Sequence, residues 1–351
     1  MKSYDVVDFG APLRVSEKLT PEPQGSEVLL RTLAAGVCHS DLHFRDGWYD
    51  LGGGKKLILK DRGIVLPLTM GHEIVGEVVA LGPEAAGVQV GDKRLAHPWI
   101  GCGTCAVCRR GEEQFCSAPR FLGAFRPGGY ADHVLVPHPR YLLDFGRLSP
   151  TQAAPYACSG LTAYGALKRV GEAIVREQPI MIIGAGGLGL MCLTLHNAMG
   201  GKAAIVADVD PQKREAAIRA GATAAIDARA ADAKKLALAA ADGPIAAAID
   251  FVGASATAQL SIDVIVRGGK YVIVGLFGGD ITLSLPLLPI RAITVQGSYV
   301  GSLAEMKELL ALVATGRVPP APISERGLDQ VNAVLEDLSA GRIVGRAVLT
   351  P

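Results

Sequence analysis

The chain lacks the features that mark several classes of protein. Lysine plus arginine number 35 against 34 for aspartate plus glutamate, so no charge excess favours nucleic acid or a membrane surface as a partner. The start, MKSYDVVDFG, contains no continuous apolar stretch, so we expect no signal peptide. No apolar run approaches the roughly 18 residues that a membrane span needs. We therefore expect a cytoplasmic protein whose partner is neither nucleic acid nor membrane.

Cysteine is also scarce, with seven residues in a chain of 351. This is too few for a disulfide scaffold, and close spacing of cysteines in a chain without a secretion signal indicates metal ligation in a reducing compartment. Apolar residues make up 49% and charged residues 20%, as in globular proteins. The length allows two domains and a large buried core.

Four of the cysteines, Cys102, Cys105, Cys108 and Cys116, lie in the single run GCGTCAVCRRGEEQFC. Two residues separate each of the first three, and seven precede the fourth. Iron–sulfur runs start in the same way but continue with three residues and then Cys-Pro, whereas zinc knuckles place their cysteine pairs further apart. The spacing therefore favours a closed, tetrahedral structural zinc site in a lobe at about residues 97–118.

A second group of candidate ligands is dispersed along the chain. It comprises Cys38 in GVCHSD, Cys158 in YACSGLT, and His72 with Glu73 in MGHEIVG. A single buried cysteine usually packs as a small hydrophobic residue, and a single histidine is usually a core residue. Together, two thiolates and one imidazole supply three zinc ligands and leave one position open for substrate, and Glu73 directly follows the candidate ligand His72. The seventh cysteine, Cys192, falls inside a predicted helix, where we expect core packing.

The pattern of apolar residues changes after about residue 150. Before it, short β-like runs are punctuated by glycine and proline, and no helix longer than about three turns is predicted. After it, apolar runs alternate with helix-period segments, which predicts a parallel, doubly wound sheet. The strands predicted before the change are Val28–Ala35, Ile74–Leu81 and Asp132–Val136. The predicted sheet contains Ile180–Ile183, Ala203–Ala207, Ala224–Ile226, Ala246–Asp250, Tyr271–Val274 and Ile293–Gln296, with helices at Gly187–Gly200, Pro211–Ala220, Ala231–Ala240 and Ala254–Val266.

The alternation of apolar runs with helix-period segments stops in the last 50 or so residues. We predict helices near Ser302–Ala314 and Asp329–Ala340 and a final strand at Ala347–Leu349. A segment this short is too small for a domain of its own. We therefore expect it to pack back on the first domain.

The strand Ile180–Ile183 runs directly into the turn GAGGLG, a G-x-G-x-x-G sequence. Gly184 permits the tight turn, Gly186 lets the backbone approach a pyrophosphate, and Gly189 lets the following helix pack closely on the sheet. Gly187 and Leu188 complete the turn, and the helix N-terminus offers free N–H groups to the phosphates. A bare match to this motif is weak, but here a strand precedes it and a helix follows it.

An acidic residue, Asp208, ends the next predicted strand. A carboxylate there accepts hydrogen bonds from the adenosine ribose and repels a 2′-phosphate, which indicates NAD rather than NADP. The alternative for Asp208 is a solvated strand end or a helix cap. Lys213 is a further candidate for contact with the same ribose, and an exposed helix lysine is its alternative.

These motifs occur in a characteristic order: GVCHSD, GHE, the four-cysteine lobe, CSGLT and GAGGLG. In this order they resemble the medium-chain zinc-dependent alcohol dehydrogenases over essentially the whole chain, and most closely the tetrameric prokaryotic NAD-dependent branch. The resemblance implies an α/β protein with a GroES-like, β-rich catalytic domain, residues 1–158 and 300–351, and a Rossmann domain, residues 159–299. It also implies NAD, two zinc ions per subunit, and a homotetramer, with a dimer as the alternative.

The resemblance further assigns roles around the metal. Cys38, His72 and Cys158 match the ligands of a catalytic zinc, and Glu73 matches an acid that replaces water or substrate on the metal in some states. Asp41 matches an acid that orients the ligand histidine. The implied reaction is reversible hydride transfer between a primary or secondary alcohol and NAD, giving an aldehyde or ketone. The alcohol is expected on the zinc as an alkoxide, whose proton leaves through Ser40 and His43.

On the coenzyme side, Thr162 matches a contact to the nicotinamide, and Arg346 matches a basic residue near the pyrophosphate, with a surface arginine as the alternative. His39 stands where many members have arginine, so we expect looser coenzyme binding. Residues 48–66 form a longer connection than in many members. We expect this connection to shape substrate access, and a simple surface insertion is the alternative.

Large side chains near the expected cleft are candidates for an apolar substrate wall, although each is equally compatible with core packing. They are Trp48, Trp99, Phe121 and Tyr299, with Tyr49 and Leu276. Such a wall would favour medium-sized or aromatic alcohols over ethanol.

Four rival interpretations explain part of the pattern. Polyol dehydrogenases of the same superfamily tend to place a carboxylate at the position of Cys158, and zinc-free quinone reductases lack both metal sites. A zinc-binding regulatory or nucleic-acid module would account for the cysteine lobe, but it would leave the glycine turn and Asp208 unexplained. A protein that has lost its catalytic role would have no need of an intact ligand set and proton relay.

Overall fold

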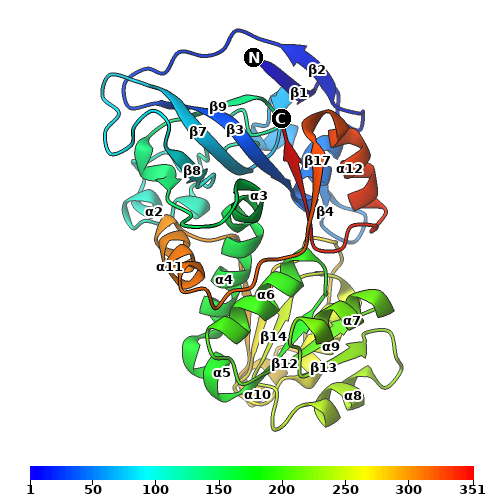
Figure 1. Ribbon diagram of the computed structural model, residues 1–351. Coiled ribbons are helices and arrows are strands. Elements are labelled where there is room, and N and C mark those ends of the chain that lie inside the picture. The colour runs from blue at the N-terminus through cyan, green and yellow to red at the C-terminus, as the bar shows by residue number, and fades with distance from the viewer.

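The computed structural model describes residues 1–351 and consists of two parts, one above the other in Figure 1. The upper part is rich in β-strands and holds both termini. The lower part holds a parallel sheet with helices on its faces. The predicted α/β fold class, with a β-rich unit beside a doubly wound sheet, is confirmed.

The parallel sheet of the lower part has six strands, and every neighbouring pair is parallel. In spatial order they are β13 (Ala224–Asp227), β12 (Ala203–Asp208), β11 (Pro179–Ile183), β14 (Ala247–Asp250), β15 (Lys270–Ile273) and β16 (Thr294–Gly297). All six predicted strands are present, each within one residue of its predicted bounds. The crossover helices are α6 (Gly187–Ala198), α7 (Pro211–Arg219), α8 (Ala233–Ala240) and α9 (Ser255–Val264), within two residues of prediction.

Alternate residues of the central strand β11 pack on opposite faces of the sheet, as the two-residue period of a strand requires. Ile180 and Ile182 belong to a cluster of 59 buried residues that extends into the upper part. Met181 and Ile183 belong to a separate cluster of 13 buried residues on the other face. The strand is apolar throughout because both of its faces are covered.

The connection between the two parts contains two helices that we did not predict, α4 (Ser159–Val170) and α5 (Glu172–Glu177). Apart from Lys168 and Arg169, every residue of α4 is buried, so α4 has no polar face to produce a helical period in the sequence. A Cβ on Gly165 would lie 2.6 Å from the carbonyl oxygen of Val300. The glycine therefore lets α4 pack directly against the chain that returns to the upper part.

The upper part is built on a seven-stranded sheet around the long strand β3 (Val28–Val37). The sheet order is β10 (Leu142–Leu143), β8 (Lys93–Ala96), β7 (Glu73–Leu81), β3, β18 (Arg346–Thr350) and β17 (Ile323–Gly327), with β9 (His133–Val136) also paired to β3. Strand β18 pairs with β3, so the C-terminal segment returns to the first part of the chain. Strand β17 and the short helix α10 (Leu287–Arg291) were not predicted. The predicted domains are residues 1–158 with 300–351 and residues 159–299. This division stays a prediction, and the strands found in each sheet are compatible with it.

The remaining elements of the upper part are short. A three-stranded sheet contains β2 (Arg14–Glu17), β1 (Lys2–Val6) and β6 (Leu68–Thr69), and β4 (Trp48–Asp50) forms a hairpin with β5 (Lys56–Ile58). The helices are α1 (His39–Asp46), α2 (Ala106–Arg109), α3 (Pro150–Ala153), α11 (Leu303–Ala314) and α12 (Val331–Ser339). None of those before residue 151 exceeds three turns, as predicted.

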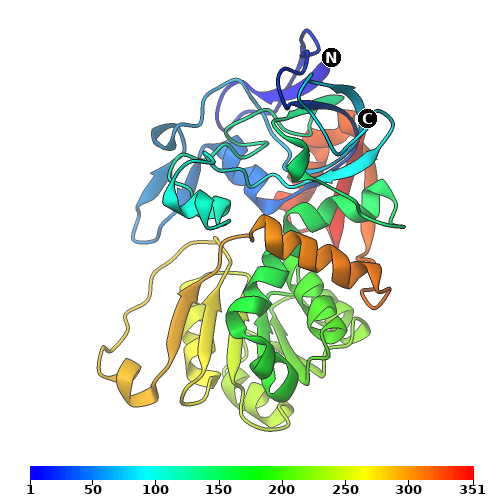
Figure 2. The ribbon, with the colours of Figure 1, turned by 90° about the vertical axis from the view of Figure 1, so that its left-hand side faces the viewer.

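Helix α11 lies across the junction between the two parts in both ribbon views (Figures 1 and 2). Its N-terminus is closed by a reciprocal capping box, in which Ser302 Oγ accepts from the Glu305 N–H at 3.1 Å and Glu305 Oε2 accepts from the Ser302 N–H at 2.7 Å. Glu305 also forms an ion pair with Arg169 of α4 at 2.5 Å. These contacts fasten the returning chain to α4.

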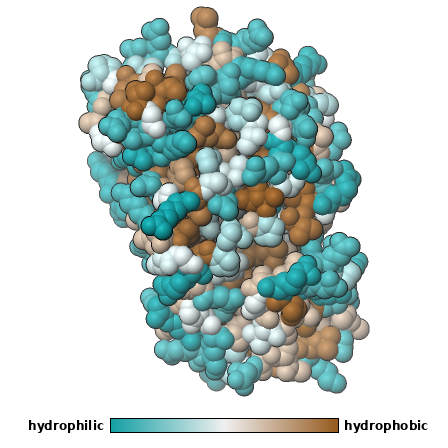
Figure 3. Space-filling view, in the orientation of Figure 1, coloured by the Kyte–Doolittle hydropathy of each residue, from teal (hydrophilic) through white to brown (hydrophobic).

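The surface view shows apolar side chains gathered along the waist between the two parts, on a surface that is otherwise largely hydrophilic (Figure 3). None of the helices combines the length and the apolar character that crossing a bilayer requires.

Candidate active site and metal centres

Three of the predicted ligands come together from different elements. Cys38 ends the run of β3 and precedes α1, His72 directly precedes β7, and Cys158 directly precedes α4. Because β3 and β7 are antiparallel neighbours, the end of one lies beside the start of the other. The sulfur atoms of the two cysteines and a ring nitrogen of His72 all lie within 4.8 Å of one another, and all three residues are buried.

The donor atoms of this cluster fit a zinc ion. The two sulfur atoms of Cys38 and Cys158 are 3.8 Å apart. This is far beyond the about 2.05 Å of a disulfide and matches the about 3.8 Å edge of a tetrahedron with Zn–S bonds of about 2.3 Å. Both ring nitrogens of His72 are buried without a hydrogen-bond partner, so the ring can offer a free nitrogen to a metal. A hydrogen bond from the Cys158 thiol, assisted by His72, holds the pKa of Cys38 well below its ordinary value despite burial, which favours the thiolate.

The carboxylate of Asp41 faces His72 with one oxygen and accepts two hydrogen bonds with the other. Its Oδ1 is 3.3 Å from His72 Nδ1. Its Oδ2 accepts hydrogen bonds from the backbone N–H of Cys38 at 2.9 Å and from the hydroxyl of Tyr130 at 2.7 Å. An acid in this place fixes the orientation and tautomer of a ligand histidine. Tyr130 was missed in the sequence, because nothing local marks a tyrosine whose partner lies far along the chain.

Glu73 is not among the grouped ligand atoms. Its Oε1 pairs with the guanidinium of Arg346 and accepts from the backbone N–H of Ser159 at 3.2 Å, while Oε2 has no partner. Burial raises the pKa of Glu73, and the neighbouring charge of Arg346 opposes this rise. Arg346 holds Oε1 and leaves Oε2 unpartnered, and the role of Glu73 as an occasional metal ligand stays a prediction.

A cleft of about 390 Å³ runs from this cluster along the junction of the two parts. It is lined by residues from α1, the glycine turn, the end of β12, the segment after β15 and the start of β18. The predicted site residues in its lining are Cys38, His39, Ser40, His43, Gly184, Gly186, Gly187, Leu188, Gly189, Asp208, Lys213 and Arg346. Cys38 therefore links the metal cluster to the cleft that the dinucleotide motif lines.

The glycines of the turn are required by close contacts. A Cβ on Gly189 would lie 1.7 Å from the carbonyl oxygen of Gly184, whose own φ of 91° lies in the left-handed region. A Cβ on Gly187 would lie 2.7 Å from Cδ of Arg346. The turn therefore brings β11, α6 and Arg346 closer together than any other residue type would permit.

Asp208 is held by two backbone N–H groups. Its Oδ2 accepts from Ala185 at 2.6 Å, and its Oδ1 accepts from Asp210 at 2.9 Å. The first bond joins the carboxylate directly to the glycine turn, and the second fixes the entrance to α7, whose N-cap is Asp210. Asp208 is therefore neither the solvated strand end nor the helix cap considered from the sequence, because it is buried and Asp210 is the N-cap of α7. It lies in the cleft lining.

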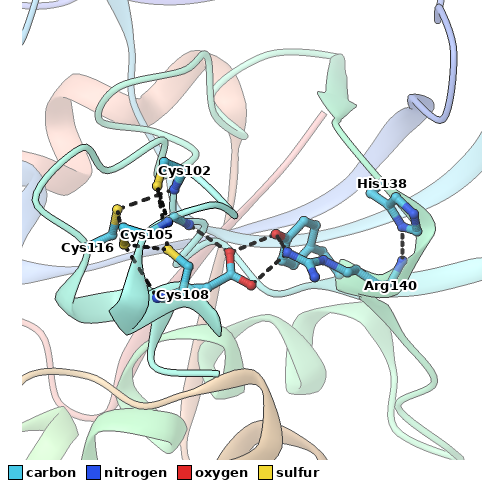
Figure 4. A network of polar contacts seen from close by, with 9 residues as sticks. Cys102, Cys105, Cys108, Cys116, His138 and Arg140 are labelled. Carbon is cyan, nitrogen blue, oxygen red and sulfur yellow. Dashed lines mark hydrogen bonds and ion pairs between the residues drawn. The ribbon is translucent and has the colours of Figure 1, made fainter. Parts of the chain in front are cut away.

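The four cysteines of the lobe gather at one end of the network in Figure 4. The Sγ–Sγ distances are 3.9 Å for Cys102 and Cys108, 3.4 Å for Cys105 and Cys108, and 3.8 Å for Cys105 and Cys116. Backbone N–H groups point at three of the sulfur atoms: Cys105 at that of Cys102, Cys108 at that of Cys105, and Cys102 at that of Cys116. N–H groups directed at sulfur stabilise thiolates, so this lobe also fits a tetrahedral zinc site.

Comparison with known proteins agrees with this geometry. Residues 24–145 match the alcohol dehydrogenase GroES-like domain, and residues 187–315 match the zinc-binding dehydrogenase domain. The chain belongs to the zinc-dependent alcohol dehydrogenase family. It is 38% identical to an NAD-dependent alcohol dehydrogenase of Sulfurisphaera tokodaii and 37% identical to one of Saccharolobus solfataricus, each over 100% of both chains. The crystal structure of an alcohol dehydrogenase from Aeropyrum pernix superposes with a TM-score of 0.89 at 31% identity, covering 100% of both chains.

Helix α1, which follows Cys38, carries three residues that line the cleft: His39, Ser40 and His43. Ser40 and His43 lie one helical turn apart and both line the cleft. The ring of His43 stacks on Tyr49 at a centroid distance of 4.4 Å. Burial lowers the pKa of His43, and the nearby His39 lowers it further, so the imidazole is neutral at neutral pH.

Three of the predicted wall residues form one aromatic cluster beside the dispersed ligands. The ring of Trp99 lies 5.4 Å from His72, 5.3 Å from Phe121 and 6.0 Å from Tyr299. Trp48 has no ring contact with this cluster and instead carries the ammonium group of Lys56 over its face at 3.5 Å. Leu276 lines the dinucleotide side of the cleft, and Thr162 is buried on α4 with its hydroxyl unpartnered.

The long connection at residues 48–66 is the β4–β5 hairpin with its flanks, and its tip reaches the lower part of the molecule. A Cβ on Gly52 would lie 2.6 Å from the backbone carbon of Gly279, and one on Gly278 would lie 2.8 Å from Asp50 Cβ. The segment that follows β15 therefore contacts the hairpin across the junction. No residue of this connection is in the lining of the cleft, so its role in shaping substrate access stays a prediction.

Proposed function

We propose that the protein is an NAD-dependent alcohol dehydrogenase that interconverts primary or secondary alcohols with aldehydes or ketones. The observation that carries this proposal is the convergence of Cys38, His72 and Cys158, with Cys38 lining the cleft that the glycine turn also lines. A metal beside a dinucleotide site is the arrangement that hydride transfer from a bound alcohol needs. The names of the two archaeal relatives support both the coenzyme and the substrate class.

Two zinc ions are expected per chain. Cys38, His72 and Cys158 would hold the catalytic ion, and Cys102, Cys105, Cys108 and Cys116 would hold the structural ion. The catalytic ion, when bound, supplies a Lewis acid that polarises the oxygen of the alcohol or carbonyl. The three-ligand set leaves one position for that oxygen, whereas the four-cysteine set is closed.

Residues of α1 then transfer the proton of the alcohol. Ser40 follows Cys38 by two residues and lines the same cleft, so its oxygen can accept the proton of the alcohol while its own hydroxyl proton passes outwards towards His43. His43, neutral because burial lowers its pKa, can receive the proton at the outer end and release it to solvent. In the reverse direction the same groups return a proton to the carbonyl oxygen.

The coenzyme would lie along the glycine turn. NAD, when bound, accepts or donates the hydride at its nicotinamide ring. Gly184, Gly186 and Gly189 let the pyrophosphate approach the backbone at the N-terminus of α6. The carboxylate of Asp208 meets the ribose and disfavours a 2′-phosphate. The other predicted coenzyme contacts are His39, Thr162, Gly187, Leu188, Lys213 and Arg346.

The aromatic cluster would form the substrate wall. Trp99, Phe121 and Tyr299 offer flat, apolar surface next to the ligand His72. Such surface gains more from a benzyl or medium-length side chain than from the methyl group of ethanol. We therefore infer a preference for larger alcohols.

A panel of alcohols assayed by NADH absorbance, with NAD and NADP side by side and metal quantified on the same preparation, tests the function. We expect two zinc ions per chain, turnover with NAD, and a higher kcat/KM for benzyl alcohol than for ethanol. A protein that holds both metals but oxidises no alcohol in the panel would contradict the proposed activity. A clear preference for ethanol would contradict only the inference about the wall.

Self-association and location complete the proposal. Strand β16 is the edge of the parallel sheet, every one of its residues is exposed, and apolar side chains before it, including Leu285 and Ile290, are also exposed. We infer that a second copy covers this edge in a dimer or tetramer, because an unpaired edge strand readily pairs with another chain. Light scattering measures the mass directly, and a monomer at micromolar concentration would contradict this inference. Seven free thiols are consistent with a reducing compartment, so we place the protein in the cytoplasm.

A further inference from the structure

Glu113 is a buried carboxylate inside the four-cysteine lobe. It lies between Cys108 and Cys116 in the chain, and it is only 7% exposed. Its neighbour Glu112 is only half-buried and forms a surface pair with Arg110 at 2.9 Å. A buried carboxylate is costly unless several donors satisfy it, so the partners of Glu113 indicate its purpose.

Three donors from two segments of the chain converge on this carboxylate, in the network of Figure 4 that links the cysteines to Arg140. Oε2 accepts from the backbone N–H of Gly101 and from the hydroxyl of Tyr141, both at 2.8 Å. Oε1 accepts from the guanidinium of Arg140 at 2.7 Å. The carboxylate thus ties the lobe to the segment before Cys102 and to the chain beyond the lobe.

Gly101 is the point at which the lobe joins the rest of the chain. A Cβ on this residue would lie 2.4 Å from Sγ of Cys108, so its backbone lies directly against a ligand sulfur. Its N–H bond to Glu113 fixes the same peptide from the other side. The position of Gly101 is therefore set jointly by the lobe and by Glu113.

Two residues before Gly101, the chain reaches the open metal site. The indole N–H of Trp99 donates to the carbonyl oxygen of Ala157 at 3.0 Å, immediately before the ligand Cys158. The indole ring packs on the ligand His72 at 5.4 Å. The short segment Trp99–Gly101 therefore has one end on the four-cysteine lobe and the other on the dispersed ligands.

His97, just before this segment, is held by Tyr141, which is a second partner of the Glu113 carboxylate. The backbone N–H of His97 donates to the carbonyl oxygen of Tyr141 at 2.8 Å, and the rings of the two residues stack at 6.4 Å. The hydroxyl of Tyr141 in turn donates to Glu113. Residues 97–101 are thus fixed to Glu113 directly at Gly101 and through Tyr141 at His97.

We propose that Glu113 is a positioning residue that couples the four-cysteine lobe to the substrate wall by fixing residues 97–101 and hence Trp99. On this view, the lobe contributes to substrate binding as well as to stability. The proposal rests on the proposed dehydrogenase function only for its kinetic readout. The position of Trp99 and the retention of zinc can be measured without any turnover.

The test compares Glu113→Gln with the matched control Glu112→Gln, which removes the same charge from the half-buried neighbour. The amide of glutamine keeps one acceptor and loses the second, so Glu113→Gln cannot satisfy all three donors. In a Trp48→Phe background, Trp99 is the only tryptophan, and its emission reports its surroundings. Zinc release to a chromogenic chelator reports the lobe.

We expect Glu113→Gln to shift the Trp99 emission, to speed the release of one of the two zinc ions, and to raise the KM for alcohol about tenfold. The KM for NAD and the behaviour of Glu112→Gln should stay unchanged. Should Glu113→Gln fold poorly, Tyr141→Phe removes a single donor while keeping the ring on His97, and smaller shifts in the same three readouts are expected.

A lower melting temperature with unchanged Trp99 emission and unchanged alcohol KM would overturn the proposal, because Glu113 would then act within the lobe alone. An equal rise in the KM values for alcohol and NAD would overturn it too, since the effect would not be specific to the substrate wall. If the parent enzyme oxidises no alcohol, the proposed function fails. The emission and zinc-release comparisons would still decide the role of Glu113.

Discussion

The four-cysteine lobe takes its ligands from one short run of chain, whereas Cys38, His72 and Cys158 come from three separate elements. The lobe is partly exposed, with Cys102 and Cys105 only half-buried, and the dispersed cluster is fully buried. The short spacing within this run is enough to bring the sulfur atoms of the four lobe cysteines together. The second cluster exists only when the sheet around β3 has folded and α4 has docked. The two sites therefore differ in what each loses when one ligand is removed.

The largest effect is expected at the buried cluster. Cys38→Ser should lower alcohol turnover by at least about a thousandfold, because a Lewis acid contributes several kcal/mol and each 1.4 kcal/mol is about tenfold in rate. NADH binding, followed by fluorescence, should survive, since the glycine turn is untouched. The control is Cys192→Ser, at a buried thiol of α6 that is distant from both clusters in the chain. Full turnover by zinc-depleted Cys38→Ser would break the assignment of this cluster.

The next effect concerns the acid behind the ligand histidine. Asp41→Asn should weaken zinc binding at the buried cluster by about tenfold to a hundredfold, because it weakens the hold on His72 Nδ1. Asp46→Asn, at the other end of α1, is the matched control and should retain its zinc. Dialysis against graded chelator with metal analysis measures the difference. Equal zinc loss in both variants would mean that the helix, rather than its contact with His72, supports the site.

A smaller effect is expected in the pH profile. The pKa of His43 lies below its ordinary value of 6.5, chiefly through burial. Above that pKa the imidazole is neutral and accepts the proton of the alcohol, and below it the ring is already protonated. The kcat/KM for alcohol oxidation should therefore fall on the acid side. His43→Gln should lose this dependence together with about tenfold in rate. His133→Gln, at a half-buried histidine paired with Asp132, should keep the parental profile.

The smallest effect on kcat is expected at the lobe. Cys105→Ser should lower the melting temperature by about 5–10 °C, because the lobe would lose its metal cross-link. The kcat should stay within about threefold of the parent, since Cys105 touches none of the dispersed ligands. Calorimetry and steady-state kinetics on the same preparation separate the two quantities. An unchanged melting temperature would argue against a structural metal and would erase the contrast between the sites.

The sequence predicted best those elements whose signal is local. The central strands of the parallel sheet are apolar because both of their faces are covered, and the bounds of all six strands were predicted to within one residue. Helix α4 was missed for a related reason, since a helix buried on nearly every side has no amphipathic period. Strand β17 was missed because it is half-exposed and carries Ser324, Glu325 and Arg326, a composition that suits a loop equally well.

The candidate site also separates into features with a local sequence signal and contacts without one. The ligand types and the glycine turn could be named from motifs, but the pairing of Glu73 with Arg346 could not. That pair joins residues 273 positions apart in the chain, and it forms because β18 and β7 both lie next to β3. Trp48 was grouped with the other aromatic residues on chemistry alone, and its hairpin carries it to Lys56 instead.

The sequence by itself determined which donor atoms the protein offers and which turn receives a dinucleotide, because both depend on residue type and short spacing. Only the tertiary structure decided that Asp41 rests on Tyr130, that Glu113 holds Gly101, and that Trp99 meets His72. These contacts join residues whose separation along the chain carries no signal. They arise from the packing of complete sheets and helices, which brings polar groups together only after the chain has folded.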